Sequence, residues 1–258
     1  MKNQGVELGL SWNDQIGKDF TYSVGANLAY NHNEVGSIPT EDGIIHGATN
    51  QIYSNAEEFY RAENGHAIGY FWGFKTAGIF QNKQEINDWI AAGNGVYQSS
   101  VQPGDVKYVD VNHDGVIDAK DKVDLGNGLP KYTFGFNINL GYKGFDLSLN
   151  ATGAAGFQIA QSYRDPNSSQ SNYSRQILNR WTGEGTSNSM PRAIWGDPNQ
   201  NCRVSDRFVE DGSYLRVKNI TLSYTFPKQW LQKLQIENAR LSLSCENVAT
   251  ITGYSGFD

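Results

Sequence analysis

The stretch YTFGFNINLGY, Tyr132–Tyr142, alternates strictly between two kinds of side chain. Its even-numbered positions are all aromatic or aliphatic, whereas its odd-numbered positions hold only Thr, Gly and Asn. Because successive side chains of a strand point to opposite faces, the stretch predicts a strand with one apolar and one polar face. A strand that crosses a bilayer needs roughly 9–11 residues between aromatic girdles, whereas a strand of a soluble protein is usually about 5–6 residues long. We therefore expect lipid to cover the apolar face.

Five further segments carry the same alternation, and they are residues 6–12, 20–30, 145–151, 214–226 and 239–245. In the fourth of these, Leu215 and Val217 lie in the opposite phase to Ile220 and Leu222, which predicts a β-bulge between the two pairs. The sequence thus predicts an all-β protein with about six antiparallel membrane-spanning strands.

The connections between these segments alternate in length. Residues 13–19, 143–144 and 227–238 form short turns, whereas residues 31–131 and 152–213 form long insertions. Short turns on one side and long loops on the other are typical of an outer-membrane barrel, whose long loops face outward. We expect both insertions to be extracellular, and any strands within residues 31–131 to stay outside the bilayer.

Six strands do not close a barrel, because two strand edges would remain unpaired in lipid at a high cost for each backbone group. The first residues also lack the apolar core of a signal peptide, which an outer-membrane protein requires. We therefore expect residues 1–258 to be a slice of a larger barrel.

Composition narrows the class of function. The chain of 258 residues has a formal net charge of −6 and no basic patch, which argues against nucleic acid as a partner. The sequence contains no run of 18 apolar residues, so it predicts no membrane-spanning helix. Patterns typical of a Ser-His-Asp triad, a P-loop or a Rossmann fold are absent, so the sequence does not predict an enzyme. Cys202 and Cys245 lack metal-ligand spacing, and whether they pair stays open.

Residues 110–121, DVNHDGVIDAKD, match the twelve-residue calcium loop, with Gly115 at the sharp turn. The predicted ligands are oxygen donors of Asp110, Asn112, Asp114, Val116 (through its backbone carbonyl), Asp118 and Asp121. Asp121 stands where an EF-hand has Glu, so the loop resembles dockerin-type loops more closely. The same Asp, Asn and Gly residues also favour a turn without metal. We predict a structural calcium clip in an extracellular loop.

Aromatic residues crowd the two insertions. Such side chains can stack on sugar rings or on peptide side chains, but they also pack loops together and anchor girdles. The sequence leaves both readings open and assigns no ligand-binding residue. These aromatic residues are Tyr70, Phe71, Trp72, Phe74, Trp89, Tyr163, Tyr173, Trp181 and Trp195.

Several motifs together resemble one protein family. They are NQGVEL (residues 3–8), PGDVKY (103–108), the loop at 110–121, PKYTFGF (130–136), GYKGFDL (141–147), VEDGSYLRVKNI (209–220) and ENVATITGYSGFD (246–258). Their content and order resemble the SusC/RagA-type TonB-dependent transporters of Bacteroidetes. The resemblance covers nearly the whole chain and is weakest at residues 31–60 and 152–207.

The resemblance implies an importer in the outer membrane of a Gram-negative cell. It implies a 22-stranded barrel in which this chain supplies about strands 16 to 21, while the plug domain, the TonB-contacting segment and the last strand lie outside it. The implied partners are outer-membrane lipid, a SusD-like lipoprotein and an oligosaccharide or peptide substrate, with TonB reached only through the missing N-terminal parts. The alternative is a soluble β-rich carbohydrate-binding module with a dockerin-like calcium loop, which would fold as a self-contained globule.

Overall fold

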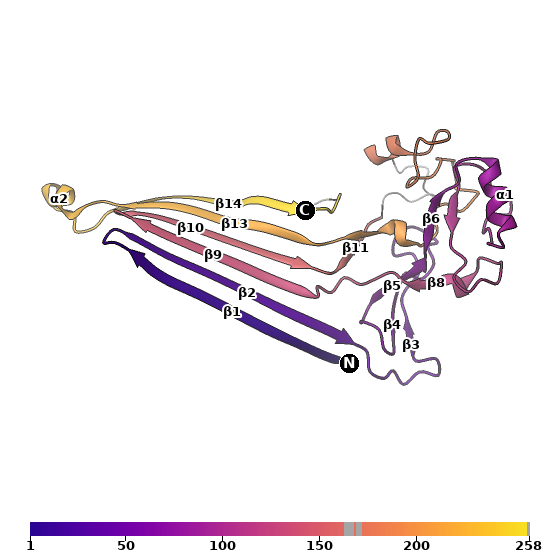
Figure 1. Ribbon diagram of the computed structural model, residues 1–258, viewed down its shortest axis with the longest axis horizontal. Helices are drawn as coiled ribbons and strands as arrows, with labels where there is room; N and C mark the ends of the chain where they lie inside the picture. Colours follow the sequence, from indigo (N-terminus) through magenta and orange to yellow (C-terminus); the bar gives the residue numbers. More distant parts are fainter. Residues whose placement is uncertain (163–167, 169–171, 257–258) are drawn as a thin grey trace.

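A long antiparallel sheet of six strands forms one half of the computed structural model, and a folded cap lies at one end of it (Figure 1). The structure describes residues 1–162, 168 and 172–256. In sheet order the strands are β1 (Lys2–Ile16), β2 (Phe20–Glu34), β9 (Tyr132–Tyr142), β10 (Phe145–Ala155), β13 (Tyr214–Thr225) and β14 (Arg240–Thr252). All six predicted strands are confirmed. Four of them run beyond their predicted bounds, because backbone pairing continues where the apolar pattern stops.

The strand register places the apolar faces side by side. Ile138 of β9 lies opposite Val24 of β2 on one side and Leu149 of β10 on the other. Leu149 in turn lies opposite Ile220 of β13. The same alignment holds one step further along, where Leu140, Leu147, Leu222 and Leu243 are in register. The apolar residues therefore form continuous rows across the sheet.

The predicted bulge is present in β13. Its register with β10 shifts between Asn150 and Ala151, which leaves Lys218 without an opposite residue. Leu215 now pairs with Gly153, and Val217 with Ala151, so both lie on the same face as Ile220. The bulge thus restores one apolar face over the whole length of β13.

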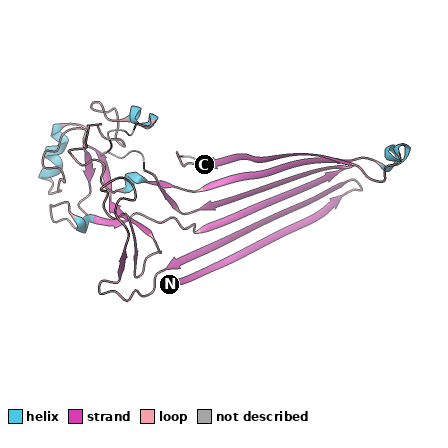
Figure 2. Cartoon of the chain, turned by 180° about the vertical axis from the view of Figure 1, so that it is seen from behind, coloured by secondary structure: helices cyan, strands magenta, loops and turns pink. Residues whose placement is uncertain are grey.

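Short connections join the strands in pairs at the end away from the cap (Figure 2). The β9–β10 turn consists of Lys143 (φ 46°) and Gly144 (φ 87°), and two positive φ angles are what a tight two-residue hairpin turn requires. The β13–β14 connection contains α2 (Lys228–Leu231) and the 3₁₀ helix η4 (Gln232–Leu234). No helix in the described part of the chain is long and apolar enough to cross a membrane.

The two long insertions fold together into the cap, and their strands form small sheets of their own. One sheet contains β3 (Ile44–His46), β4 (Tyr60–Glu63), β5 (Tyr70–Phe74) and β8 (Lys122–Asp124), and two others pair β6 (Thr76–Ile79) with β7 (Val106–Tyr108) and β11 (Gln158–Ala160) with β12 (Val209–Asp211). The helices are α1 (Lys83–Ala91) and the 3₁₀ turns η1 (Ala119–Asp121), η2 (Arg175–Asn179) and η3 (Asp206–Phe208). Tyr163, Phe257 and Asp258 lie outside the described residues.

Aromatic residues from both insertions build the core of the cap. Phe59 and Phe71 of the first insertion stack with ring centroids 5.2 Å apart, and they pack with Val204 and Phe208 of the second. A second cluster surrounds Phe74, which is fully buried. Loop packing therefore accounts for these Phe residues, whereas Trp195 is 66% exposed.

A buried ion pair also joins the two insertions. Asp105, which is fully buried, accepts hydrogen bonds from Nε (2.7 Å) and Nη2 (3.1 Å) of Arg192. The side-chain amide of Asn201 donates a further bond of 2.9 Å to the same carboxylate. Because charge-assisted pairs with two parallel bonds fix geometry as well as energy, Asp105 holds the second insertion in place.

We expect Asp105→Ala to destabilise the cap by about 3 kcal/mol, because it leaves the Arg192 guanidinium without its counter-ion. Limited proteolysis of the folded protein would then cleave residues 172–213 faster than in the wild type. Asp88→Ala is the matched control, since Asp88 is exposed and its carboxylate accepts from the Gln84 side chain on the same helix. Equal cleavage rates in the two variants would contradict the role of Asp105.

Candidate functional site

The apolar face of the six-stranded sheet is open to its surroundings, and we call it the outer belt. On β1 and β14 it exposes Val6 (70%), Leu10 (64%) and Leu243 (74%), and on the central strands Phe136 is still 44% exposed. Monomeric soluble proteins rarely expose a contiguous apolar face that runs across six strands. Hydrocarbon would cover such a face without the free-energy cost of exposing apolar surface to water.

Aromatic residues border the outer belt at both ends. At the turn end, Phe20, Tyr142, Phe145 and Tyr224 are in register across four strands, with the rings of Phe145 and Tyr224 4.5 Å apart. At the cap end, the rings of Tyr30 and Tyr132 lie 5.3 Å apart.

The separation of the two aromatic rows matches a bilayer. Tyr132 and Tyr142 end the same strand, so a rise of roughly 3.3 Å per residue places them about 33 Å apart along β9. A strand tilt of about 40° reduces this separation to about 25 Å along the membrane normal, which is the height of the apolar band of outer-membrane barrels.

The opposite face of the sheet is polar and carries glycines between its amide side chains. A Cβ atom on Gly25 would lie 2.1 Å from Oδ1 of Asn137, so the Asn137 side chain lies flat across β2. Between β13 and β14, hydrogen bonds join Ser244 to Asn219 (2.8 Å) and to Thr221 (2.9 Å). Such a face suits the polar interior of a barrel.

The predicted calcium loop is organised by hydrogen bonds from its own backbone. The Asp110 carboxylate is 2% exposed and accepts from the N–H of Gly115 (2.7 Å). The buried Asp121 carboxylate accepts from the N–H groups of Val111 (2.9 Å) and Asp118 (2.8 Å). Asp118 and Asp121 thus form a reciprocal capping box at η1. The carboxylate at position 12 of the loop, that of Asp121, therefore already accepts hydrogen bonds from backbone N–H groups.

The remaining predicted ligands lie on the exposed part of the loop. Asn112 Nδ2 donates to Asp114 Oδ2 (2.9 Å), and Asp114 Oδ1 accepts from the N–H of Val116 (2.9 Å). Within the described residues, no three or more His, Cys, Asp or Glu side chains gather as a metal site. The loop oxygens are of the type that calcium prefers, but their present bonds are those of a hydrogen-bonded turn. Calcium binding stays a prediction.

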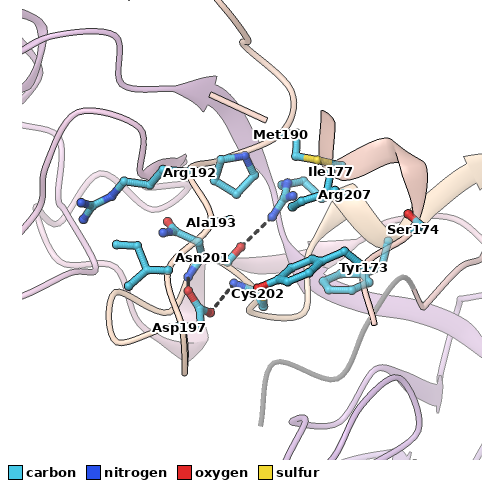
Figure 3. Close-up of a pocket in the computed structure, with 13 residues that line it drawn as sticks. Tyr173, Ser174, Ile177, Met190, Arg192, Ala193, Asp197, Asn201, Cys202 and Arg207 are labelled. Carbon is cyan, nitrogen blue, oxygen red and sulfur yellow. Dashed lines mark hydrogen bonds between the residues drawn. The ribbon is translucent and has the colours of Figure 1, made fainter. Parts of the chain in front are cut away.

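A cavity of ≈ 110 Å³ lies in the cap, among side chains that sequence reasoning missed (Figure 3). Ile177, Met190, Asp197 and Arg207 are among its walls. Burial raises the pKa of the Asp197 carboxyl, against the opposing effect of hydrogen bonds from the backbone N–H groups of Cys202 and Asn201. Among the described residues, Tyr173 is the only predicted aromatic residue that lines this cavity. No local sequence pattern marks the other lining residues, because they come together only when the insertion folds.

Known proteins resemble the chain over its full length. It is 28% identical over 260 residues to TonB-dependent receptor P3 of Formosa agariphila, and 26% identical over 265 residues to TonB-dependent receptor SusC of Bacteroides thetaiotaomicron. Both alignments cover 100% of this chain but only 25% and 24% of the relatives, so the chain spans about a quarter of their length. No family model matches the sequence.

Solved structures give the same result for the fold. The chain superposes on a chain of the RagAB peptide importer in its closed-closed state with a TM-score of 0.71 at 23% identity, covering 99% of this chain and 26% of that one. In the open-open state the TM-score is 0.70. The resemblance to SusC/RagA-type TonB-dependent transporters is confirmed, and so is the all-β fold of antiparallel strands. The open sheet and the receptor relatives do not favour the soluble binding module.

Charge placed on the outer belt should block assembly in the membrane. We expect Ile138→Arg, near the middle of β9, to cost about 2–4 kcal/mol and to lower the amount of folded protein in the membrane fraction. Asn139→Arg is the matched control, because Asn139 is the next residue, on the polar face, opposite Ser23 and Ser148. Heat-dependent migration on gels measures the folded fraction, and equal losses in both variants would argue against lipid on the outer belt.

Proposed function

We propose that this chain forms part of the barrel wall and of the extracellular cap of a TonB-dependent nutrient importer in the outer membrane. One observation carries the proposal: the outer belt has the height of a bilayer between two aromatic rows, on a sheet that resembles TonB-dependent receptors along its whole length. The role is transport rather than catalysis.

In this proposal the sheet and the cap have different roles. The outer belt contacts lipid, and the polar face lines the lumen through which substrate passes. The outward edges of β1 and β14 pair with further strands of the same barrel, because hydrocarbon offers no other partner for their backbone groups. The cap meets the substrate, a glycan or a peptide, together with a SusD-like lipoprotein, and TonB acts through parts of the protein outside these residues.

Energy coupling is the decisive test of this proposal. We expect cells that carry the gene to grow on the imported glycan or peptide as sole nutrient, and to lose this growth when either the gene or TonB is deleted. Reintroducing the gene restores growth in the first strain only. Growth that persists without TonB would indicate a passive pore instead.

We also propose that calcium binds the loop at residues 110–121 as a structural clip of the cap. The oxygen donors at loop positions 1, 3, 5, 9 and 12 support this, as does the tight turn at Gly115 (φ 81°). Ile117, at position 8, is 5% exposed and packs into the second apolar cluster, which connects the loop to the core of the cap.

Removing the metal tests the clip. We expect calcium to raise the melting temperature of the detergent-solubilised protein relative to a sample in EGTA, because a ligand that binds only the folded state stabilises it. Asp114→Ala should abolish this increment with little change in EGTA, since Asp114 is exposed and bonds only within the loop. Equal melting temperatures of the wild type in calcium and in EGTA would refute the clip.

A further inference from the structure

The cavity in Figure 3 has the size and lining of a site for one aliphatic side chain. It lies between η2 and the segment after Met190, and Ile177, Met190 and Ile194 supply aliphatic walls. Its volume is ≈ 110 Å³. Apolar cavities of about 150 Å³ take up molecules as large as benzene, so a branched aliphatic group fits this one.

Arg207 brings a fixed positive charge to the wall of this cavity. Its Nη1 donates to the backbone carbonyl of Asn201 (2.6 Å) and its Nε to the carbonyl of Ser189 (3.3 Å), which hold the guanidinium in place. Among the described residues no carboxylate forms an ion pair with Arg207. A guanidinium has five N–H donors and binds carboxylates with two parallel bonds, so Arg207 retains donors for an anionic ligand.

Two carboxylates lie near Arg207, and both accept hydrogen bonds from other groups. Asp197 also lines the cavity, and its carboxylate accepts from the N–H groups of Asn201 (2.9 Å) and Cys202 (2.8 Å) (Figure 3). Burial raises the pKa of this carboxyl, and the charge of Arg207 acts against that larger effect. Asp206 accepts from both the hydroxyl (2.7 Å) and the N–H (3.1 Å) of Thr76. In the described part of the chain neither carboxylate accepts an N–H of Arg207, so its remaining N–H donors can bond a ligand.

A second, larger hollow of mixed lining adjoins the cavity. It has a volume of ≈ 570 Å³ and shares Met190 and Arg207 with the first. Asn179 and Asn188 are among its lining residues. Amide groups pair with peptide N–H and C=O groups, so Arg207 stands between an apolar pocket and a hollow suited to a peptide backbone.

We propose that this pair of cavities binds the C-terminal end of a peptide whose last residue is aliphatic. The last side chain enters the apolar cavity, the terminal carboxylate pairs with Arg207, and the preceding peptide groups lie in the larger hollow. A glycan carries no aliphatic group of this kind, so the site selects peptide over sugar. The inference rests on the proposed function in that it names the substrate class of the importer.

Binding to the purified full-length protein in detergent tests the site, with the tripeptide Ala-Ala-Leu and its C-terminal amide as probes. We expect calorimetry to show binding of the free acid and a loss of about tenfold or more for the amide. Arg207→Gln should remove this difference between acid and amide. Arg175→Gln is the matched control, because Arg175 is exposed on η2 and does not line the cavity. Equal affinities of acid and amide for the wild type would overturn the role of Arg207.

A second variant keeps the test decisive if Arg207→Gln fails to fold. Ala193 is exposed at the cavity, so Ala193→Trp adds bulk there while leaving Arg207 and its two carbonyl partners intact. We expect this variant to lose peptide binding. Unchanged binding, or no binding of the acid by the wild type, would overturn the inference. TonB-dependent growth on a glycan in the same strain would leave the proposed function standing.

Discussion

Every backbone N–H and C=O group that enters hydrocarbon must find its partner within the protein, and this constraint governs the long sheet. It requires strands long enough to pair from one aromatic row to the other, and it requires antiparallel neighbours in register over that length. The pairing of Tyr30 with Tyr132, and of Phe20 with Tyr142, meets both requirements in β2 and β9. Once the register is set, the two-residue alternation assigns each side chain to lipid or to the lumen.

The cap obeys a different constraint, because its loops lie where water can satisfy the backbone. Its order comes from packing between the two insertions, through stacked Phe rings and the bidentate pair of Asp105 with Arg192. The sheet brings both insertions to the same end, where Phe59 and Phe71 of the first pack with Val204 and Phe208 of the second. The larger hollow beside Arg207 is lined by both insertions, because residues 76–79 of the first insertion contribute to its wall.

The sequence predicts the sheet well because its signals are local. Alternation within Tyr132–Tyr142 is visible in eleven residues, and the phase change between Val217 and Ile220 locates a bulge without any partner strand. The cap shows the opposite case, since Asp105 and Arg192 lie 87 residues apart and nothing in either neighbourhood indicates the other. Arg207 was missed for the same reason, because its role depends on carbonyl groups at Ser189 and Asn201. At Asp121 the motif predicts a metal ligand, and in the structure the carboxylate accepts hydrogen bonds from the backbone N–H groups of Val111 and Asp118.

The placement of the short turns has a consequence for the order in which the protein assembles. β1 with β2, β9 with β10, and β13 with β14 are hairpins of neighbours in the chain, so each can form quickly by itself. Joining β2 to β9 must instead close a loop of roughly a hundred residues, which is the slow, entropically costly kind of step. Packing within the cap offsets part of this entropic cost, because it orders the chain between the two strands. Defects in the core of the cap should therefore delay the joining of hairpins even where every spanning residue is intact.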